Sequence, residues 1–328
     1  MDEDLHAKYC EKENPGRFVK PCPGTPGHVC CGYMIINYAQ GCTLGCTYCI
    51  LNAYFDGEAP VLFINRDRLF EELRDTLKNE RLFRLGTGEF TDSLLFEGMS
   101  SLYETLVPYI SSVKNAVLEI KTKTVNIDRL LKIKYHDNTI VSWSLNSDYI
   151  ALTEESNAPD IARRIEAAAL ISREGYRLAF HFDPLIMHKN WKDGYKAVVD
   201  RLFRVIDPEC VVYVSLGALR FVPEMRTYMK ERRAEYIFEG EFIKGLDNKM
   251  RYFRPLRTQM YLFLKEVLTQ YIEEDRLYMC METPVVWEDV FKLRMTTKLL
   301  SERLDRACYT KFKGLVSYKS ATSRQGRR

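Results

Sequence analysis

The sequence predicts an α/β protein built on a partial (β/α)6 TIM-like barrel with a C-terminal α/β extension. Apolar strand-like runs alternate with helix-like segments between residues 33 and 216. Such alternation is typical of parallel strands joined by right-handed helical crossovers. The chain has 328 residues, 46% of them hydrophobic, which is enough for one large core. Polar residues also follow the predicted strands, where barrels of this type place functional groups.

Six apolar runs give the predicted strands, at residues 33–38, 82–85, 116–120, 139–145, 177–182 and 210–216. Helices are predicted between them at residues 66–79, 94–112, 126–132, 159–173 and 191–205. The first helix rests on Leu69, Phe70, Leu73 and Leu77, whose spacing of one helical turn places them on one face.

Four parts of the chain are expected. They are an N-terminal segment (1–29), the barrel (30–217), a region that covers the barrel mouth and helps to select the substrate (218–317), and a basic tail (318–328). The tail is rich in Ser, Gly, Gln and Arg, so we expect it to be disordered.

The composition argues against a membrane-spanning protein and against a secreted one. No run of 18 apolar residues predicts a membrane span, and residues 1–14 are charged and lack the apolar core of a secretory signal. We therefore expect a cytoplasmic protein, in which the ten cysteines are metal ligands or buried thiols rather than disulfides. A net charge of +3 is too small to indicate a nucleic-acid partner by itself.

The most specific motif is C-x3-C-x2-C, formed by Cys42, Cys46 and Cys49. Iron–sulfur clusters usually take four cysteine thiolates, so three local ones indicate a cluster with one open metal corner. The alternative is a structural zinc site, although such sites normally combine two cysteine pairs across a long spacer. Further ligands would come from nearby cysteines, which are otherwise interpreted as buried thiols: Cys22, Cys30 and Cys31.

Polar residues at five strand ends form a second pattern. Each alone has an ordinary explanation as a turn or a hydrogen-bonded structural group. Their agreement across the strands favours a common site. The residues are Gly88, Glu89, Lys121, Lys123, Ser144, Asn146, His181, Asp183 and Ser215.

The cysteine loop, with Tyr48 just before its last cysteine, resembles the cluster loop of the radical S-adenosylmethionine (radical SAM) enzymes. The resemblance implies a [4Fe-4S] cluster on Cys42, Cys46 and Cys49, whose open iron binds S-adenosyl-L-methionine. It also implies an electron donor such as flavodoxin or ferredoxin, because one electron cleaves the cofactor to a 5′-deoxyadenosyl radical that abstracts hydrogen from the substrate.

Further segments narrow the resemblance to the spore photoproduct lyase family, over most of residues 18–290. They are FVKPCPGTPG (18–27), ILNAYF (50–55), GTGEFTDS (86–93), EIKTKT (119–124), WSLN (143–146), FHFDP (180–184) and MRYFRPL (250–256). Founding members repair a methylene-bridged thymine dimer in DNA by abstracting one hydrogen atom. The resemblance thus implies a lyase-type radical SAM enzyme, with thymine-lesion repair and damaged DNA as its possible reaction and partner. The alternatives are a radical SAM enzyme for an unrelated non-DNA substrate and a zinc-stabilised nucleic-acid-binding protein without catalysis.

Site residues follow from these motifs. In addition to the three cluster cysteines, Tyr48 and Tyr252 are candidate catalytic side chains. The segment at 86–89 resembles one that contacts the methionyl amino group, and Lys123 and Ser144 match positions that contact the cofactor. With the other polar residues of these motifs, the predicted cofactor-binding set is Gly86, Thr87, Gly88, Glu89, Asp92, Lys123, Ser144, Asn146, His181, Asp183 and Ser215.

Two departures from the family pattern concern the end of the reaction. The lyases carry a hydrogen-donating cysteine where this chain has Phe90, and a tyrosine where it has Ile50. Neither Phe nor Ile has a weak S–H or O–H bond. The chain is therefore interpreted as a member outside the sporulation type that lacks the usual donor, with Tyr54, Tyr252 or Cys280 as substitutes.

Basic segments for DNA are present but diluted by acids. Residues 229–233, 249–257 and the tail offer cations for phosphates, and Tyr252 and Phe253 offer aromatic rings for base stacking. For 229–233, ordinary solvated charge is the favoured interpretation.

Overall fold

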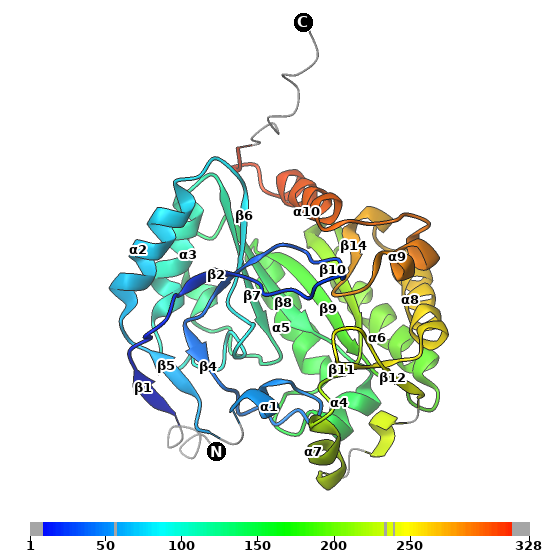
Figure 1. Ribbon diagram of the computed structural model, residues 1–328. Coiled ribbons are helices and arrows are strands. Elements are labelled where there is room, and N and C mark those ends of the chain that lie inside the picture. Colours follow the sequence, from blue (N-terminus) through cyan, green and yellow to red (C-terminus); the bar gives the residue numbers. More distant parts are fainter. Residues whose placement is uncertain (1–8, 56–57, 233–234, 239, 317–328) are drawn as a thin grey trace, which may run out of the picture.

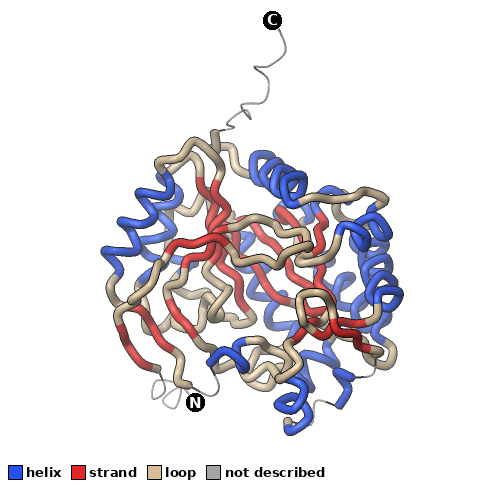
Figure 2. The backbone as a smooth tube through the Cα atoms, in the orientation of Figure 1, coloured by secondary structure: helices blue, strands red, loops and turns tan. Residues whose placement is uncertain are grey.

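The computed structural model describes residues 9–55, 58–232, 235–238 and 240–316. Its centre is one curled sheet, flanked by helices, with the strand order β14-β10-β9-β8-β7-β6-β3-β2 (Figures 1 and 2). These strands are β2 (Val19–Pro21), β3 (Met34–Ile36), β6 (Phe83–Gly86), β7 (Ala116–Thr122), β8 (Thr139–Ser144), β9 (Arg177–Leu185), β10 (Val211–Ala218) and β14 (Leu277–Met279).

Every neighbouring pair in this sheet is parallel except β2 and β3. The six predicted strands correspond to β3 and β6 through β10, so the predicted partial barrel is confirmed. The sequence did not predict β14, which comes from the expected covering region and pairs with β10 as a further parallel strand.

Two small sheets flank the barrel. One has the order β1-β5-β4, the other β11-β13-β12. Their strands are β1 (Cys10–Lys12), β4 (Ala39–Gln40), β5 (Val61–Phe63), β11 (Arg220–Phe221), β12 (Phe242–Lys244) and β13 (Met250–Tyr252).

The α-helices in the described part of the chain are α1 (Leu51–Phe55), α2 (Arg66–Leu77), α3 (Leu102–Ser112), α4 (Asp148–Glu154), α5 (Ile161–Arg173), α6 (Trp191–Val205), α7 (Met225–Glu231), α8 (Arg254–Leu268), α9 (Pro284–Phe291) and α10 (Thr297–Lys311). Short 3-10 helices are η1 (Leu130–Lys132), η2 (Pro208–Cys210), η3 (Glu235–Phe238) and η4 (Glu274–Arg276). None of the helices in the described ranges has the length and apolar character needed to cross a bilayer.

Two helix predictions were wrong. The helix expected at 94–112 begins only at Leu102, because residues 93–99 form turns, the first of which is stabilised by an Asp92 side-chain oxygen that accepts the Leu94 N–H. The helix expected at 126–132 is reduced to η1. There the Thr124 hydroxyl accepts the Asn126 N–H, and such local side-chain bonds compete with helix formation. Helix α4 was not predicted, although Ser147 caps its N-terminus.

Strands β8 and β10 are buried along their entire length. Parallel strands behave in this way because both faces of the sheet are covered. Helices α5 and α6 lie behind the sheet, whereas the N-terminal segment with β2 crosses in front of it (Figure 1). The polar side chains of His181 on β9 and Ser215 on β10 are buried.

Helix α10 is tied to the sheet by an ion pair between a buried arginine and a partly buried aspartate. The Arg84 guanidinium on β6 lies 2.8 Å from the Asp305 carboxylate on α10. Arg84 also donates to the Ser301 hydroxyl at 3.1 Å. With β14, this helix fastens the C-terminal region to the barrel.

Candidate functional site

The three cysteines of the C-x3-C-x2-C loop sit in a loop whose glycines are sterically required. Gly41 and Gly45 both have positive φ angles, 81° and 66°. A Cβ atom on Gly41 would lie 3.0 Å from the Pro60 Cα, and one on Gly45 would lie 2.8 Å from the Ser156 hydroxyl. Glycine is the residue that permits this conformation and this close approach.

All three thiols line one cavity of about 320 Å³, named here the cysteine-loop cavity. Most of the predicted site residues share its wall, although they come from loops and strand ends far apart in the sequence. The predicted residues in this wall are Cys42, Cys46, Cys49, Tyr48, Gly88, Glu89, Asp92, Lys123, Ser144 and Asp183. Phe90, Ile50, Tyr54 and Cys22 line it as well.

Burial dominates the protonation of the three thiols. It raises the pKa of Cys42 to about 12, with a further contribution from the nearby Asp92 carboxylate. Burial also raises the pKa values of Cys46 and Cys49, while the Lys123 ammonium acts in the opposite direction on both. A bound metal centre would supply the positive charge that these thiolates need.

A second chain segment clamps the cysteine loop. The Thr47 N–H donates to the Glu154 carbonyl at 2.9 Å, and the Asn157 N–H donates to the Leu44 carbonyl at 3.1 Å. Side chains add to these bonds, since the Asn157 amide donates to the Thr43 carbonyl at 2.8 Å. Residues 154–157 are the last residue of α4 and the three residues after it, so the loop is held by the connection between the fourth and fifth predicted strands.

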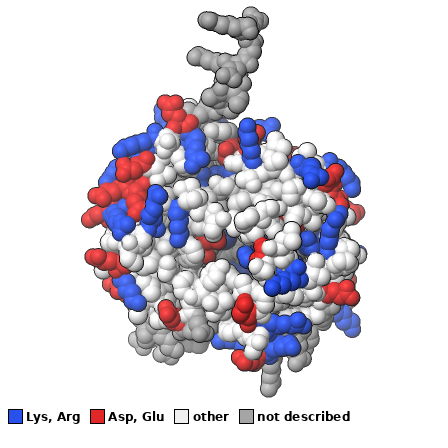
Figure 3. All heavy atoms as spheres, in the orientation of Figure 1, with Lys and Arg blue, Asp and Glu red and all other residues white. Residues whose placement is uncertain are grey.

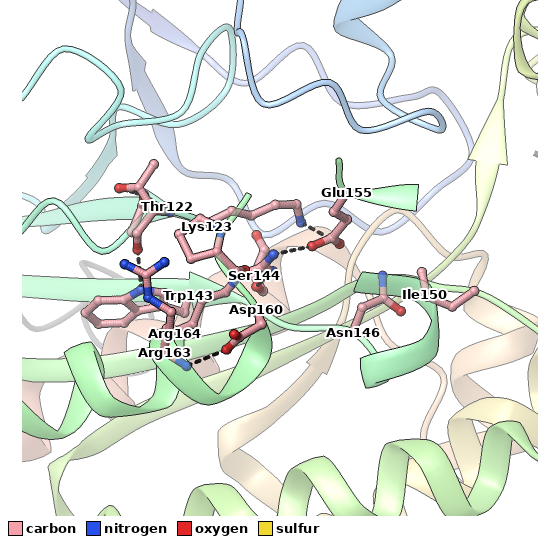
Figure 4. A network of polar contacts seen from close by, with 12 residues as sticks. Thr122, Lys123, Trp143, Ser144, Asn146, Ile150, Glu155, Asp160, Arg163 and Arg164 are labelled. Atoms are coloured by element: carbon pink, nitrogen blue, oxygen red, sulfur yellow. Dashed lines mark hydrogen bonds and ion pairs between the residues drawn. The ribbon is translucent and has the colours of Figure 1, made fainter. Parts of the chain in front are cut away.

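Glu155 is the centre of this clamp, and its buried carboxylate was not predicted from the sequence. One oxygen accepts a hydrogen bond from the Tyr48 hydroxyl and lies 3.5 Å from the Lys123 ammonium. The other oxygen accepts a hydrogen bond from the Arg164 guanidinium at 2.5 Å. In Figure 4, the Lys123 and Glu155 side chains point toward one another. Burial opposes ionisation of Glu155, but Lys123 and Arg164 outweigh it and lower its pKa. Lys123 and Tyr48 are thereby oriented at the cavity wall.

The Asp92 side chain links two neighbouring segments of the cavity wall. Its carboxylate accepts the Thr122 hydroxyl at 2.6 Å and the Lys123 N–H at 2.6 Å. It therefore joins the loop after β6 to the end of β7. Burial raises its pKa against these hydrogen bonds.

Next to this cavity lies a smaller one of about 130 Å³ inside the barrel, named here the barrel cavity. Gly86, His181 and Ser215 line it, and Gly88, Glu89 and Asp183 line both cavities. The two spaces therefore adjoin at a shared wall.

The barrel cavity contains a buried polar chain. The His181 ring lies between the Ser215 hydroxyl at 2.6 Å and the Glu119 carboxylate at 2.5 Å, and the Tyr213 hydroxyl donates to Glu119 at 2.7 Å. Burial works against the charge on Glu119, but His181 and the hydrogen bonds lower its pKa to about 2. At the shared wall, Asp183 pairs with Arg220 at 3.2 Å.

Three predicted residues are not brought to either cavity. The Thr87 hydroxyl is buried and donates to the Ser93 hydroxyl at 2.8 Å, and Asn146 bonds Tyr195 and the Pro184 carbonyl. Tyr252 is fully buried, and its hydroxyl accepts the Met187 N–H at 3.0 Å. The roles predicted for these three residues in cofactor binding and catalysis therefore stay predictions. Their hydrogen bonds within the protein support the fold.

The basic segment at 249–257 contains arginines that are already paired within the protein. Arg251 bonds Asp247, Arg254 bonds Asp289, and Arg257 bonds Glu282. On the face shown in Figure 3, charges of both signs surround a mostly uncharged, hollowed centre. Residues 318–328, Arg233 and Glu239 lie outside the described residues.

Comparison with known proteins now identifies the family. The sequence model of the family described as "Spore photoproduct lyase" matches residues 29–236, more than half of the chain. The chain belongs to the spore photoproduct lyase family. Curated relatives of the same name are a Bacillus subtilis (strain 168) protein, 27% identical over 172 residues, and a Geobacillus sp. (strain Y412MC61) protein, 24% identical over 226 residues. These alignments cover 51% and 67% of this chain, but only 50% and 64% of the relatives' length.

Solved structures of spore photoproduct lyases share the fold. One complexed with dinucleoside spore photoproduct aligns with a TM-score of 0.72 and 18% identity, covering 84% of this chain and 82% of that chain. A mutant with bound AdoMet and dinucleoside spore photoproduct aligns with a TM-score of 0.73 and 18% identity, covering 85% and 84%. The partial barrel is thus the fold of the spore photoproduct lyase family.

The arrangement of the three loop thiols can be compared with what a single metal ion and an iron–sulfur cluster each require. Within the described ranges, no three His, Cys, Asp or Glu side chains are placed to hold one metal ion. The thiols of Cys42, Cys46 and Cys49 instead share the wall of one cavity. A cubane cluster binds each thiolate at a different iron, so its ligands surround a space in this way.

Proposed function

We propose that this chain is a radical SAM enzyme of the spore photoproduct lyase type. The observation that carries the proposal is the single cavity in which the three loop thiols meet Glu89, Asp92, Lys123 and Ser144. Cys42, Cys46 and Cys49 would hold a [4Fe-4S] cluster, and the strand-end residues would hold S-adenosyl-L-methionine. When bound, this pair supplies one-electron cleavage of the cofactor to a carbon-centred radical.

The side chains of this protein would position the cofactor and exclude water. Lys123, fixed by Glu155, offers a charge-assisted hydrogen bond to a carboxylate in the cysteine-loop cavity. Glu89, which accepts the Tyr33 hydroxyl at 2.7 Å, offers a carboxylate to an amino group. The N-terminal segment and the C-terminal region cover the strand ends and shield the site.

For the substrate, we propose DNA that contains a thymine lesion of the kind bound in the relatives' structures, which hold dinucleoside spore photoproduct. Abstraction of one hydrogen atom would start the reaction. Return of hydrogen requires a donor, and neither Phe90 nor Ile50 in the cavity wall supplies one. Tyr54 and Cys22 line the same cavity, whereas Cys280 lines the adjoining one. Contacts to DNA would come from residues other than the paired Arg251, Arg254 and Arg257.

The first experiment tests cofactor cleavage. We expect anaerobically reconstituted protein to bind iron and sulfide. After reduction, it should form 5′-deoxyadenosine from added S-adenosyl-L-methionine. Replacing Cys42, Cys46 and Cys49 together with Ala should abolish both, whereas Cys10→Ala with Cys210→Ala, outside both cavities, should leave both unchanged. Tightly held zinc without iron, or unchanged product from the triple variant, would contradict the proposal.

The second experiment tests the substrate. Dinucleoside spore photoproduct deuterated at C6 of its saturated thymine ring should transfer deuterium to 5′-deoxyadenosine and disappear, because a radical at C6 can break the adjacent bond to the methylene bridge by β-scission. In D2O, repaired thymine should gain deuterium if an exchangeable thiol or hydroxyl of the protein is the donor. Cofactor cleavage without loss of the lesion would instead assign the enzyme to a non-DNA substrate.

A further inference from the structure

Four thiols from distant parts of the chain gather around the barrel cavity. Cys22 follows β2, Cys30 and Cys31 precede β3, and Cys280 follows β14. The antiparallel pairing of β2 with β3 brings the first three together, and the Cys22 N–H donates to the Tyr33 carbonyl at 3.1 Å. The proposed radical SAM function uses neither Cys30 nor Cys31.

Cys30 is the acceptor at the centre of this group. The Cys22 and Cys31 thiols interact electrostatically with its sulfur, and a Cβ atom on Gly24, two residues after Cys22, would lie 3.7 Å from that sulfur. The Gly32 N–H donates to the Cys30 sulfur, at 3.5 Å. These interactions lower the pKa of Cys30, with a further contribution from Arg84, and they raise the pKa values of Cys22 and Cys31. Of these three thiols, Cys30 is therefore the one whose thiolate form is favoured.

Cys30 is also accessible. It is partly exposed, as is Cys22, whereas Cys31 is buried. A stabilised thiolate that is accessible and adjacent to a second thiol is the usual environment of a reactive, reversibly oxidised cysteine. Cys22 is a better partner than Cys31, because a disulfide between adjacent residues closes a strained eight-membered ring.

We propose that Cys30 is a reactive cysteine with Cys22 as its resolving thiol, at a site that accepts low-molecular-weight disulfides. The Cys30 thiolate attacks a small disulfide, forms a mixed disulfide and releases one small thiolate. Cys22 then loses its proton to that thiolate, attacks the Cys30 sulfur and releases the second one. The two protein thiols are oxidised to one disulfide, and the small disulfide is reduced to two thiols.

This site has a direct connection to the cysteine-loop cavity. Cys22 lines both cavities, so the disulfide would remove its thiol from the wall beside Cys42 and Cys49. The exchange itself needs neither cluster nor cofactor. It can therefore be tested independently of the proposed radical chemistry.

The first test measures thiol reactivity in the native, cluster-free full chain. Iodoacetamide labelling at pH 6, followed by peptide mass spectrometry, should modify Cys30 about tenfold faster than Cys10, which is exposed. This measurement needs no variant. Equal or slower labelling of Cys30 would overturn the proposal.

The second test follows the exchange. Oxidised glutathione should yield a Cys22–Cys30 disulfide, seen as a linked peptide pair two hydrogens lighter. Cys22→Ser should instead trap a glutathione adduct on Cys30, Cys30→Ser should leave Cys22 unmodified, and Cys10→Ser should behave as the wild type. A wild-type adduct that never resolves, or a disulfide between another pair, would contradict the assignment.

Discussion

At the scale of single residues, the cysteine loop depends on a carboxylate with no signal in the sequence. Glu155 lies in Thr-Glu-Glu-Ser-Asn, a stretch that resembles an ordinary solvated helix end. Its side chain is nevertheless fully buried between Arg164 and Lys123. Only the packing of α4 against the loop turns this charge inward. A buried carboxylate with such partners is expected to be costly to alter.

We predict that Glu155→Gln destabilises the protein by about 3 kcal/mol, because it leaves the buried Arg164 without its counter-charge. Urea unfolding of the cofactor-free protein measures this change. The matched control is Glu154→Gln. Burial raises the pKa of Glu154, so a neutral side chain is tolerated there, and we expect a loss of less than about 1 kcal/mol. Equal losses in the two variants would show that Glu155 has no special role.

A pH-dependent prediction concerns Glu119 in the barrel cavity. Its pKa is lowered from 4.5 to about 2 in the folded protein. The unfolded state therefore binds more protons than the folded state as the pH falls below about 4.5, and this stabilisation is lost toward pH 2. Glu119→Gln should cost about 3 kcal/mol at pH 6, and the difference from wild type should shrink at lower pH. A difference that stays constant from pH 6 to pH 3 in urea titrations would contradict this account.

At the scale of elements, the clamp between the cysteine loop and residues 154–157 leads to a third prediction. Gly45 and Gly27 both have positive φ angles, but only at Gly45 would a Cβ meet a neighbour, the Ser156 hydroxyl at 2.8 Å. Gly27→Ala therefore pays backbone strain alone, about 1 kcal/mol, whereas Gly45→Ala must also push the loop from its clamp. We expect reconstituted Gly45→Ala to retain less iron per chain than Gly27→Ala. Equal iron retention would mean that the clamp does not set the loop geometry.

Much of this arrangement was predictable from the sequence because it depends on periodic patterns. The six barrel strands are apolar runs, and α6 matches its predicted range of 191–205. Helix α4 was missed despite its local cap at Ser147, whereas β14 depends on long-range contacts. Strand β14 is only three residues long and is defined by its pairing with β10. In the site, the three cysteines form a local motif, whereas Glu155 reaches Tyr48 and Lys123, and Cys22 reaches the cavity wall, through tertiary packing.

At the scale of the whole molecule, the C-terminal region is part of the barrel's structure. Strand β14 extends the sheet beyond β10, and the Cys280 N–H donates to the Leu216 carbonyl at 2.9 Å. Helix α10 adds the Arg84–Asp305 pair on the other side. Contacts of this kind couple the stability of the two parts, although the sequence suggested a boundary near residue 217.

We therefore predict that the barrel and the C-terminal region unfold together. Pulsed hydrogen–deuterium exchange across a urea titration should give the same midpoint for peptides covering β8 and peptides covering β14 with α9, because removing β14 would expose the buried edge of β10 to water. Helix α7 is a useful reference. It is short and mostly exposed, and should exchange at lower urea through local opening. A lower midpoint for β14 and α9 than for β8 would instead establish an independent C-terminal domain, and the covering region could then open over the site without unfolding the barrel.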